Sequence, residues 1–182
     1  MPFSDTRLLN VLSHTFWFLP NVASCYAMYN LLQQKQNSFY HDYRINVCAG
    51  TKAGIGVDAL EPVQKSMGDP LTTKTITLSC GKLTTGVTVP EWTAVFMLAG
   101  SFSTSAANYL QTIFRVQSPC NKDGKIKRCC YVFDFAPDRT LKMVAESAAL
   151  STKAGKANES DRLIMGEFLN YCPVIAVDGT VM

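Results

Sequence analysis

The sequence predicts an α/β protein with a mainly parallel sheet. Over the first 136 residues, short apolar, β-prone runs alternate with segments of helical spacing. Parallel strands need long crossover connections, which are usually helices, so this alternation favours a sheet with helices on both faces. Hydrophobic residues make up 47% of the 182 residues and charged residues 17%, which is typical of a well-buried globular domain.

The first expected strand is the continuous apolar run over 15–19, which ends sharply at Pro20-Asn21. Asn21 is a typical helix cap, and apolar residues recur at helical spacing from Val22 to Leu32. The remaining expected elements are a strand over 44–48, a helix over 57–66, strands over 75–78 and 93–98, a helix over about 103–114, and a strand over 128–135 that follows a polar turn at 121–127.

Ligands of parallel sheets bind beyond the carboxyl ends of the strands. The expected strands therefore place four connections along one edge: residues 20–21, the loop after Cys48, the loop after Ser79 and the segment after Leu98. We expect the functional site at this edge.

Residues 137–182 predict a helical extension of the α/β domain, which is expected over residues 1–136. Pro137 suits the first position of a helix and Asp138 its first turn. Asp178-Gly179 is a hairpin signal. Since Met182 directly follows an apolar run, we expect the extension to be truncated and the chain to be cut from a longer protein.

Charge and cysteine content narrow the function classes. The net charge is +3, from 17 basic and 14 acidic residues, so any nucleic-acid surface must be local. No run approaches the roughly 18 apolar residues of a membrane span, and no basic signal-peptide region opens the chain, so we expect a cytoplasmic protein without a membrane partner. The seven cysteines form no C-x-x-C pair, which favours reduced, buried thiols and no metal site.

A loop rich in glycine and threonine follows the strand over 75–78. Glycine allows a left-handed backbone and close approach, while short hydroxyls and backbone N–H groups suit phosphate oxygens. The residues concerned are Ser79, Gly81, Thr84, Thr85, Gly86 and Thr88. An ordinary loop that uses glycine for its turns is the alternative interpretation.

The helix over about 103–114 carries Gln111 and Arg115 one turn apart, so the two side chains are neighbours. An arginine in that place can stabilise charge on a transferring phosphoryl group. The alternative is an exposed helix face with one arginine. The polar face is expected to carry Asn108, Gln111, Thr112 and Arg115, and the apolar stripe Ala106, Tyr109 or Leu110, and Ile113 or Phe114.

Residues 83–90, Leu-Thr-Thr-Gly-Val-Thr-Val-Pro, resemble motif V of superfamily-two helicases, in the form found in motor subunits of type I and type III restriction enzymes. Residues 109–115 are similar to motif VI, and residues 15–21 resemble motif IV. Order and spacing agree over about residues 15–118. The resemblance implies a RecA-like three-layer domain, the second of two, with ATP between the domains and single-stranded nucleic acid across both.

The resemblance also implies roles for individual residues. Nucleic-acid contacts fall to Ser79, Thr84, Thr85 and the helix start at Asn21, nucleotide contacts to Gly86 and Thr88, and catalytic roles to Gln111 and Arg115, with Arg115 as the arginine finger. Two positions depart from the family pattern. Thr88 stands where the family usually has Asp, and Ser118 where it usually has a second Arg.

The parts that would bind ATP and Mg²⁺ most directly are absent from the sequence. It contains no G-x-x-x-x-G-K-[ST] loop and no Asp-Glu pair after a strand. In the resembled family these lie on the first motor domain, so we expect ATP and Mg²⁺ to act in the full-length protein and this chain alone not to hydrolyse ATP. Expected partners are DNA, an N-terminal RecA-like domain of the same protein, and nuclease or methylase subunits.

Two other functions stay open. The chain could be a non-catalytic nucleic-acid or protein-binding domain on a RecA-like scaffold, which the departures at Thr88 and Ser118 favour. A small-molecule enzyme with a doubly wound sheet is the third function, but the sequence contains no recognisable catalytic set for it.

His14 and His41 are interpreted as core or surface residues. The basic cluster at Lys122, Lys125, Lys127 and Arg128 predicts a solvated hairpin or turn, or a contact to a phosphate backbone.

Overall fold

The computed structural model describes residues 12–51, 57–84, 86–100 and 105–136, together with residues 139 and 163. The chain divides into two compact units, Met1–Phe135 and Ala136–Met182. The expected features of the extension, the helix start at Pro137 and the hairpin at Asp178, lie outside the described residues.

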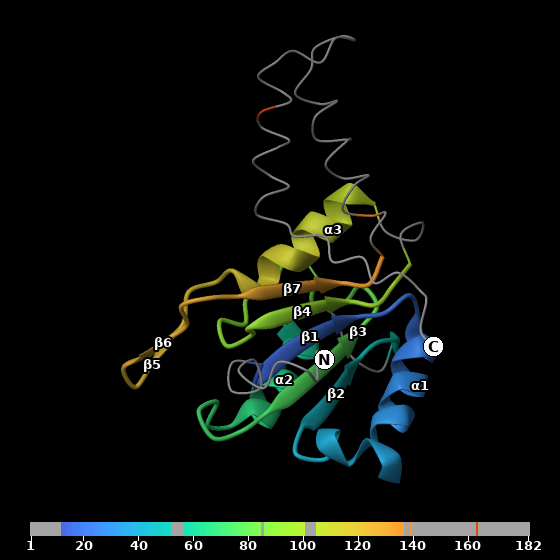
Figure 1. Cartoon of the computed structure of the whole chain (residues 1–182), viewed down its shortest axis with the longest axis horizontal. Coiled ribbons are helices and arrows are strands. Elements are labelled where there is room, and N and C mark those ends of the chain that lie inside the picture. Colours follow the sequence, from blue (N-terminus) through green and yellow to red (C-terminus); the bar gives the residue numbers. More distant parts are fainter. Residues whose placement is uncertain are drawn as a thin grey trace, which may run out of the picture. The chain divides into compact units, whose positions relative to one another are not determined.

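The first unit is built on a five-stranded sheet in the order β2-β3-β1-β4-β7, and all four strand pairs are parallel (Figure 1). The strands are β1 (His14–Phe18), β2 (Arg44–Cys48), β3 (Thr75–Ser79), β4 (Ala94–Met97) and β7 (Tyr131–Asp134), and a separate two-stranded hairpin pairs β5 (Asn121–Lys122) with β6 (Lys125–Ile126). The predicted α/β class with a parallel sheet is confirmed.

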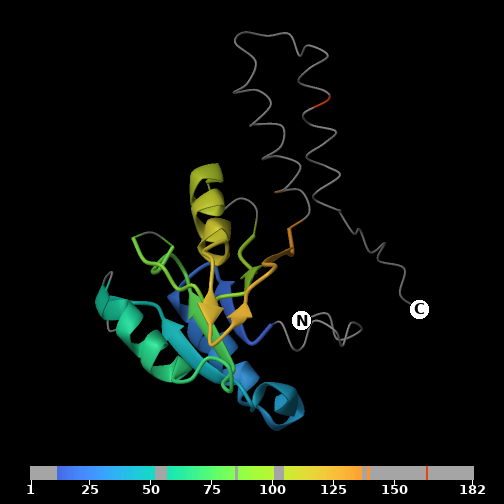
Figure 2. The same cartoon turned by 90° about the vertical axis from the view of Figure 1, so that its left-hand side faces the viewer.

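Helices cover both faces of this sheet. They are α1 (Val22–Leu32), α2 (Val57–Met67) and α3 (Ala106–Ile113), with 3-10 helices η2 (Lys35–Tyr40) and η5 (Phe114–Val116). Figure 2 shows α1 on one side of the sheet and α2 and α3 on the other. This arrangement follows from right-handed crossovers, because the chain moves in one direction along the sheet through α1 and in the opposite direction through α2 and α3. It is the three-layer form expected of a RecA-like domain.

Strands β1 and β3 are buried along their whole length, as the apolar runs predict. On the α1 face, Trp17 packs against Phe96 with ring centroids 5.2 Å apart. On the opposite face, Phe16 packs against Trp92 at 4.8 Å. These aromatic side chains therefore form part of the core on both faces of the sheet.

One helix begins as predicted, and another is shorter than predicted. Asn21 caps α1 as predicted, because its side chain accepts hydrogen bonds from the Ser24 backbone N–H at 2.8 Å and the Ser24 hydroxyl at 3.0 Å. The helix α3 is shorter than expected and begins after its cap, Ser105. Arg115 consequently lies in the 3-10 turn η5.

The predicted polar face of α3 is wrong at Thr112. This residue has no exposed surface, and its hydroxyl donates to the Asn108 carbonyl at 2.6 Å. Threonine can be buried in a helix in this way because its hydroxyl bonds to the preceding turn. Leu110 and Phe114 are instead partly exposed.

Among the described residues, no helix combines the length and the apolar composition needed to cross a membrane.

Candidate functional site at the carboxyl edge of the sheet

The carboxyl ends of four strands meet at one edge, as predicted. Ser79 at the end of β3 is the register partner of both Cys48 and Phe18, and Phe18 is also the partner of Met97. The Leu19 N–H donates to the Ser79 carbonyl at 2.8 Å, so the start of α1 lies beside the loop that follows β3. The glycine-threonine loop and the N-terminus of α1 therefore share one rim.

The loop after β3 is held in shape by its own side chains. The Ser79 hydroxyl lies 2.9 Å from the Cys48 carbonyl and 2.5 Å from the Lys82 carbonyl, and the Thr84 hydroxyl donates to the Gly81 carbonyl at 2.6 Å. Leu83 adopts a left-handed conformation with φ of 64°, which is uncommon for a non-glycine residue, and its side chain is buried. Burial and hydrogen bonds together maintain this backbone.

These bonds engage the hydroxyls of Ser79 and Thr84, which are predicted to contact nucleic acid, within the protein itself. Ser79 has no exposed surface and Thr84 is 9% exposed. In this conformation their hydroxyls close the loop on itself and do not face a ligand, because short hydroxyl side chains readily bond to nearby backbone carbonyls. Thr85, the other threonine expected to hold phosphate, lies outside the described residues.

Gly86 and Thr88 are exposed, and so is Gly81. Gly86 has φ of +71°, and a Cβ added there would meet nothing within 4 Å. The glycine is thus required by backbone conformation, and the space beside it is open to a ligand. Asn21, at the same rim, is also exposed, but its side-chain oxygen is engaged in capping α1.

Arg115 connects the two predicted motifs directly. Its Nη1 donates to the Val87 carbonyl at 2.5 Å, and its Nε donates to the Gln111 carbonyl at 3.1 Å. Gln111 therefore supports Arg115 through its backbone, while its exposed side chain remains on the surface. The structure brings together two stretches that lie 28 residues apart in sequence.

Three thiols from separate segments gather beneath the rim, which the sequence pattern did not reveal. Burial, the hydrogen-bond partner Cys80 and nearby Cys48 together raise the pKa of the Cys25 thiol to about 12. Burial likewise raises the pKa of Cys48 to about 11, against the effect of Lys82. The protonated thiols of Cys25 and Cys48 are poor nucleophiles and poor metal ligands.

The cysteines toward the end of the α/β unit do not follow the expected burial. Cys129 and Cys130 are exposed and Cys120 is half-buried. All cysteines of the described segments are free thiols, as expected. Their strand-like run is interrupted because β7 begins only at Tyr131. Within the described segments, no group of three His, Cys, Asp or Glu side chains could hold a metal ion.

Comparisons with known proteins place the chain beside one curated relative. It is 36% identical over 136 residues, or 73% of this chain, to the Mycoplasma pneumoniae protein named "Putative type II restriction enzyme and methyltransferase RM.MpnORF110P C-terminus". The chain spans only 19% of that protein's length. No protein-family model matches the chain.

A solved structure titled "Mss116p DEAD-box helicase domain 2 bound to an RNA duplex" is also similar. The match has a TM-score of 0.34 at 14% identity and covers 85% of this chain and 68% of that one.

Proposed function

We propose that this chain is the second motor domain of an ATP-dependent DNA helicase or translocase that belongs to a restriction-modification system. The name of the curated relative supports the biological setting. The hydrogen bond from Arg115 to the Val87 carbonyl carries the mechanistic part, because it joins the candidate arginine finger to the candidate nucleic-acid loop.

In this proposal, ATP and Mg²⁺ are held mainly by another RecA-like domain of the same protein. The described residues fit only one wall of such a site: they offer a guanidinium and the open backbone at Gly86, but no cluster of carboxylates for the metal. When bound between the domains, ATP supplies the phosphoryl chemistry. Arg115 donates to the developing negative charge, and Gln111 holds its side chain in place.

The two bonds of Arg115 provide a means of coupling. If the guanidinium turns so that Nη1 leaves the Val87 carbonyl, a phosphate oxygen replaces that carbonyl as a stronger acceptor because it is charged. That exchange releases one of the bonds that hold the loop over residues 79–88. The nucleotide state would then alter the loop that, together with the start of α1 at Asn21, tracks the DNA backbone.

The test is DNA-stimulated ATP turnover by the full-length protein with Arg115→Ala, Arg115→Lys and the matched control Arg44→Ala. Arg44 also donates from Nη1 to a backbone carbonyl, that of Ser66 at 2.8 Å, but it lies at the start of β2, at the other edge of the sheet. We expect Arg115→Ala to lower kcat by about 10³-fold or more, because arginine fingers contribute on that scale. Arg115→Lys retains the positive charge but not the planar, forked N–H donors of the guanidinium, so its activity should be little higher than that of Arg115→Ala.

Turnover by Arg115→Ala that equals that of Arg44→Ala would refute the finger assignment. Arg115-dependent ATP hydrolysis by the 182-residue chain alone would refute the division of the site between two domains.

A non-catalytic binding domain is the second candidate. The observations that favour it are the departures at Thr88 and Ser118 and the engagement of Arg115 by the loop's own carbonyl. A full-length protein that binds DNA but hydrolyses no ATP with or without it would select this second function.

A further inference from the structure

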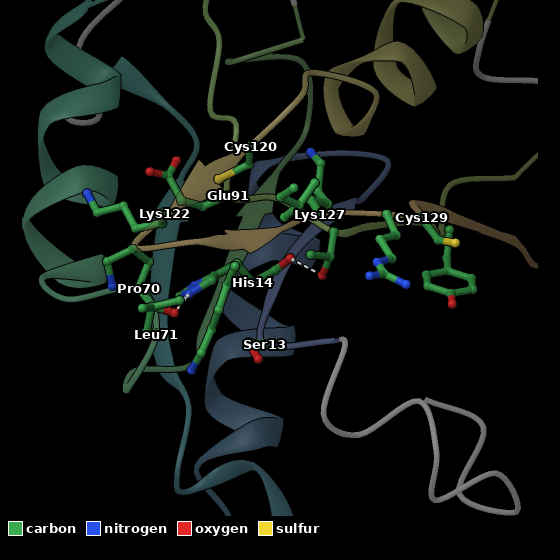
Figure 3. A pocket seen from close by; sticks show the side chains of 14 residues that line it. Ser13, His14, Pro70, Leu71, Glu91, Cys120, Lys122, Lys127 and Cys129 are labelled. Atoms are coloured by element: carbon green, nitrogen blue, oxygen red, sulfur yellow. Dashed lines mark hydrogen bonds between the residues drawn. The ribbon is translucent and has the colours of Figure 1, made fainter.

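A pocket of about 330 Å³ opens at the amino edge of the sheet, away from the site described above. Figure 3 shows side chains converging on it from three parts of the chain: Ser13 and His14 at the start of β1, Pro70 and Leu71 in the turn before β3, and Lys122 and Lys127 of the hairpin region. In Figure 1 the strand arrows point to the right, and the β5–β6 hairpin extends from the opposite side.

The hairpin brings like charges together at the mouth of this pocket. Lys122 is the register partner of Lys125, and Arg128 lies three residues further on; all three are exposed and line the pocket. Like charges directly opposite each other destabilise a strand pair. Among the described residues, none of the three forms an ion pair with a carboxylate. Asp123 at the tip and Glu91 in the lining offset this charge only in part, so a bound anion would stabilise the arrangement.

The position of the hairpin is fixed by Lys127, which has a different role from its neighbours. Its Nζ donates to the carbonyls of Pro90 at 2.6 Å, Val116 at 2.9 Å and Trp92 at 3.1 Å. All three ammonium protons are thereby used within the protein. Lys127 holds the base of the hairpin against the sheet and leaves ligand contact to the exposed basic side chains.

His14 contributes shape to the pocket and no charge. Its Nε2 lies 2.8 Å from the Pro70 carbonyl, which requires a donor, and its Nδ1 lies 2.9 Å from the Thr75 hydroxyl. Burial lowers the pKa of His14, against the effects of the Pro70 carbonyl and Glu91. The imidazole is therefore neutral at neutral pH, and the positive potential comes from lysine and arginine alone.

The layout fits a nucleic-acid strand better than a single phosphate. The three residue steps from Lys125 to Arg128 span up to about 10 Å of chain, which allows contacts to successive phosphates of one strand. Apolar side chains also line the pocket: Ile126 is 64% exposed and Leu71 37%, and Tyr131 is a further lining residue. A hollow with apolar walls can bury an unstacked base, which a duplex does not offer.

We propose that this pocket is a second nucleic-acid site, which binds single-stranded DNA. Lys122, Lys125 and Arg128 hold the phosphates, and one base enters the hollow between Ile126 and Leu71. The site goes beyond the proposed motor function, whose contacts lie at the other edge of the sheet.

The test measures binding of a fluorescent oligothymidine to the 182-residue chain across a series of salt concentrations. Lys122→Gln/Lys125→Gln should weaken binding at least 10-fold and reduce the salt slope by about 1.4, since each phosphate contact to a single strand contributes about 0.7. The control Lys35→Gln/Lys65→Gln removes two exposed charges that lie outside the pocket and should leave affinity within about 2-fold of the wild type. Glu91→Gln should tighten binding, because it removes a carboxylate from the lining.

A separate variant tests the contact between the pocket and a DNA base. Ile126→Ser should weaken binding to oligothymidine about 5-fold or more but leave binding to an abasic strand of equal length unchanged, because apolar burial of the base is lost only for the former. Equal affinities for the two lysine double variants would overturn the proposal. So would tighter binding of a duplex than of the single strand, or an Ile126→Ser variant that binds both strands like the wild type.

Discussion

Lys127 offers the sharpest test of how the α/β unit is held together. Its ammonium group donates to three backbone carbonyls that come from two different connections of the chain. Replacing it with methionine preserves the length of the side chain but leaves those carbonyls without this donor. An unsatisfied buried polar group costs about 1–3 kcal/mol. Because Lys127 is only half-buried, we expect a cost near the lower figure for each of the three carbonyls. Since loss of the buried charge offsets part of this cost, we expect Lys127→Met to lower the free energy of unfolding by about 2–4 kcal/mol.

Urea unfolding followed by tryptophan fluorescence measures this change, because both tryptophans, Trp17 and Trp92, are buried. The matched control is Lys125→Met, on the same hairpin but exposed, which should change stability by no more than about 0.5 kcal/mol. Lys127→Arg should also destabilise, because a planar guanidinium cannot place three donors as an ammonium does. If Lys127→Met unfolded at the same urea concentration as Lys125→Met, with an unchanged slope, the three bonds would not stabilise the fold and the reasoning would fail.

Two further predictions concern backbone conformation and pH. Gly86→Ala should destabilise the protein by about 1–2 kcal/mol, because Gly86 has a left-handed φ. The control Gly100→Ala should not destabilise it, because Gly100 has equal space for a Cβ and no left-handed φ. Equal unfolding midpoints of the two variants would contradict this account. Burial lowers the pKa of His14 from its usual 6.5, so the unfolded chain binds a proton that the folded chain refuses, and stability that is present above pH 6.5 should be lost as the pH falls below it. His14→Gln should flatten this dependence of the urea midpoint between pH 7 and 5, and the exposed control His41→Gln should retain it.

Local sequence patterns predicted most of the secondary structure. Strand β2 lies at its predicted bounds, and α1 begins after Asn21, because an apolar run and a capping side chain act within a few residues of chain. The burial of Thr112 and the exposure of Phe114 could not be read in the same way. Which face of a short helix is buried depends on the elements that pack against it, and apolar residues lay on more than one face of α3.

The features of the candidate sites likewise fall into those that the sequence determines and those that depend on the tertiary structure. The sequence by itself determined the parallel α/β class, the alignment of the loops at the carboxyl edge and the motifs at residues 83–90 and 109–115, since all of these follow from periodicity, turn chemistry and residue spacing. Only the tertiary structure decided that Arg115 bonds to the Val87 carbonyl and that Ser79 and Thr84 turn their hydroxyls inward. Hydrogen-bond partners distant in sequence are chosen by where the strands place them, and no local pattern records that choice. For the same reason, only the fold showed that the basic hairpin borders a pocket formed with the start of β1 and the turn before β3.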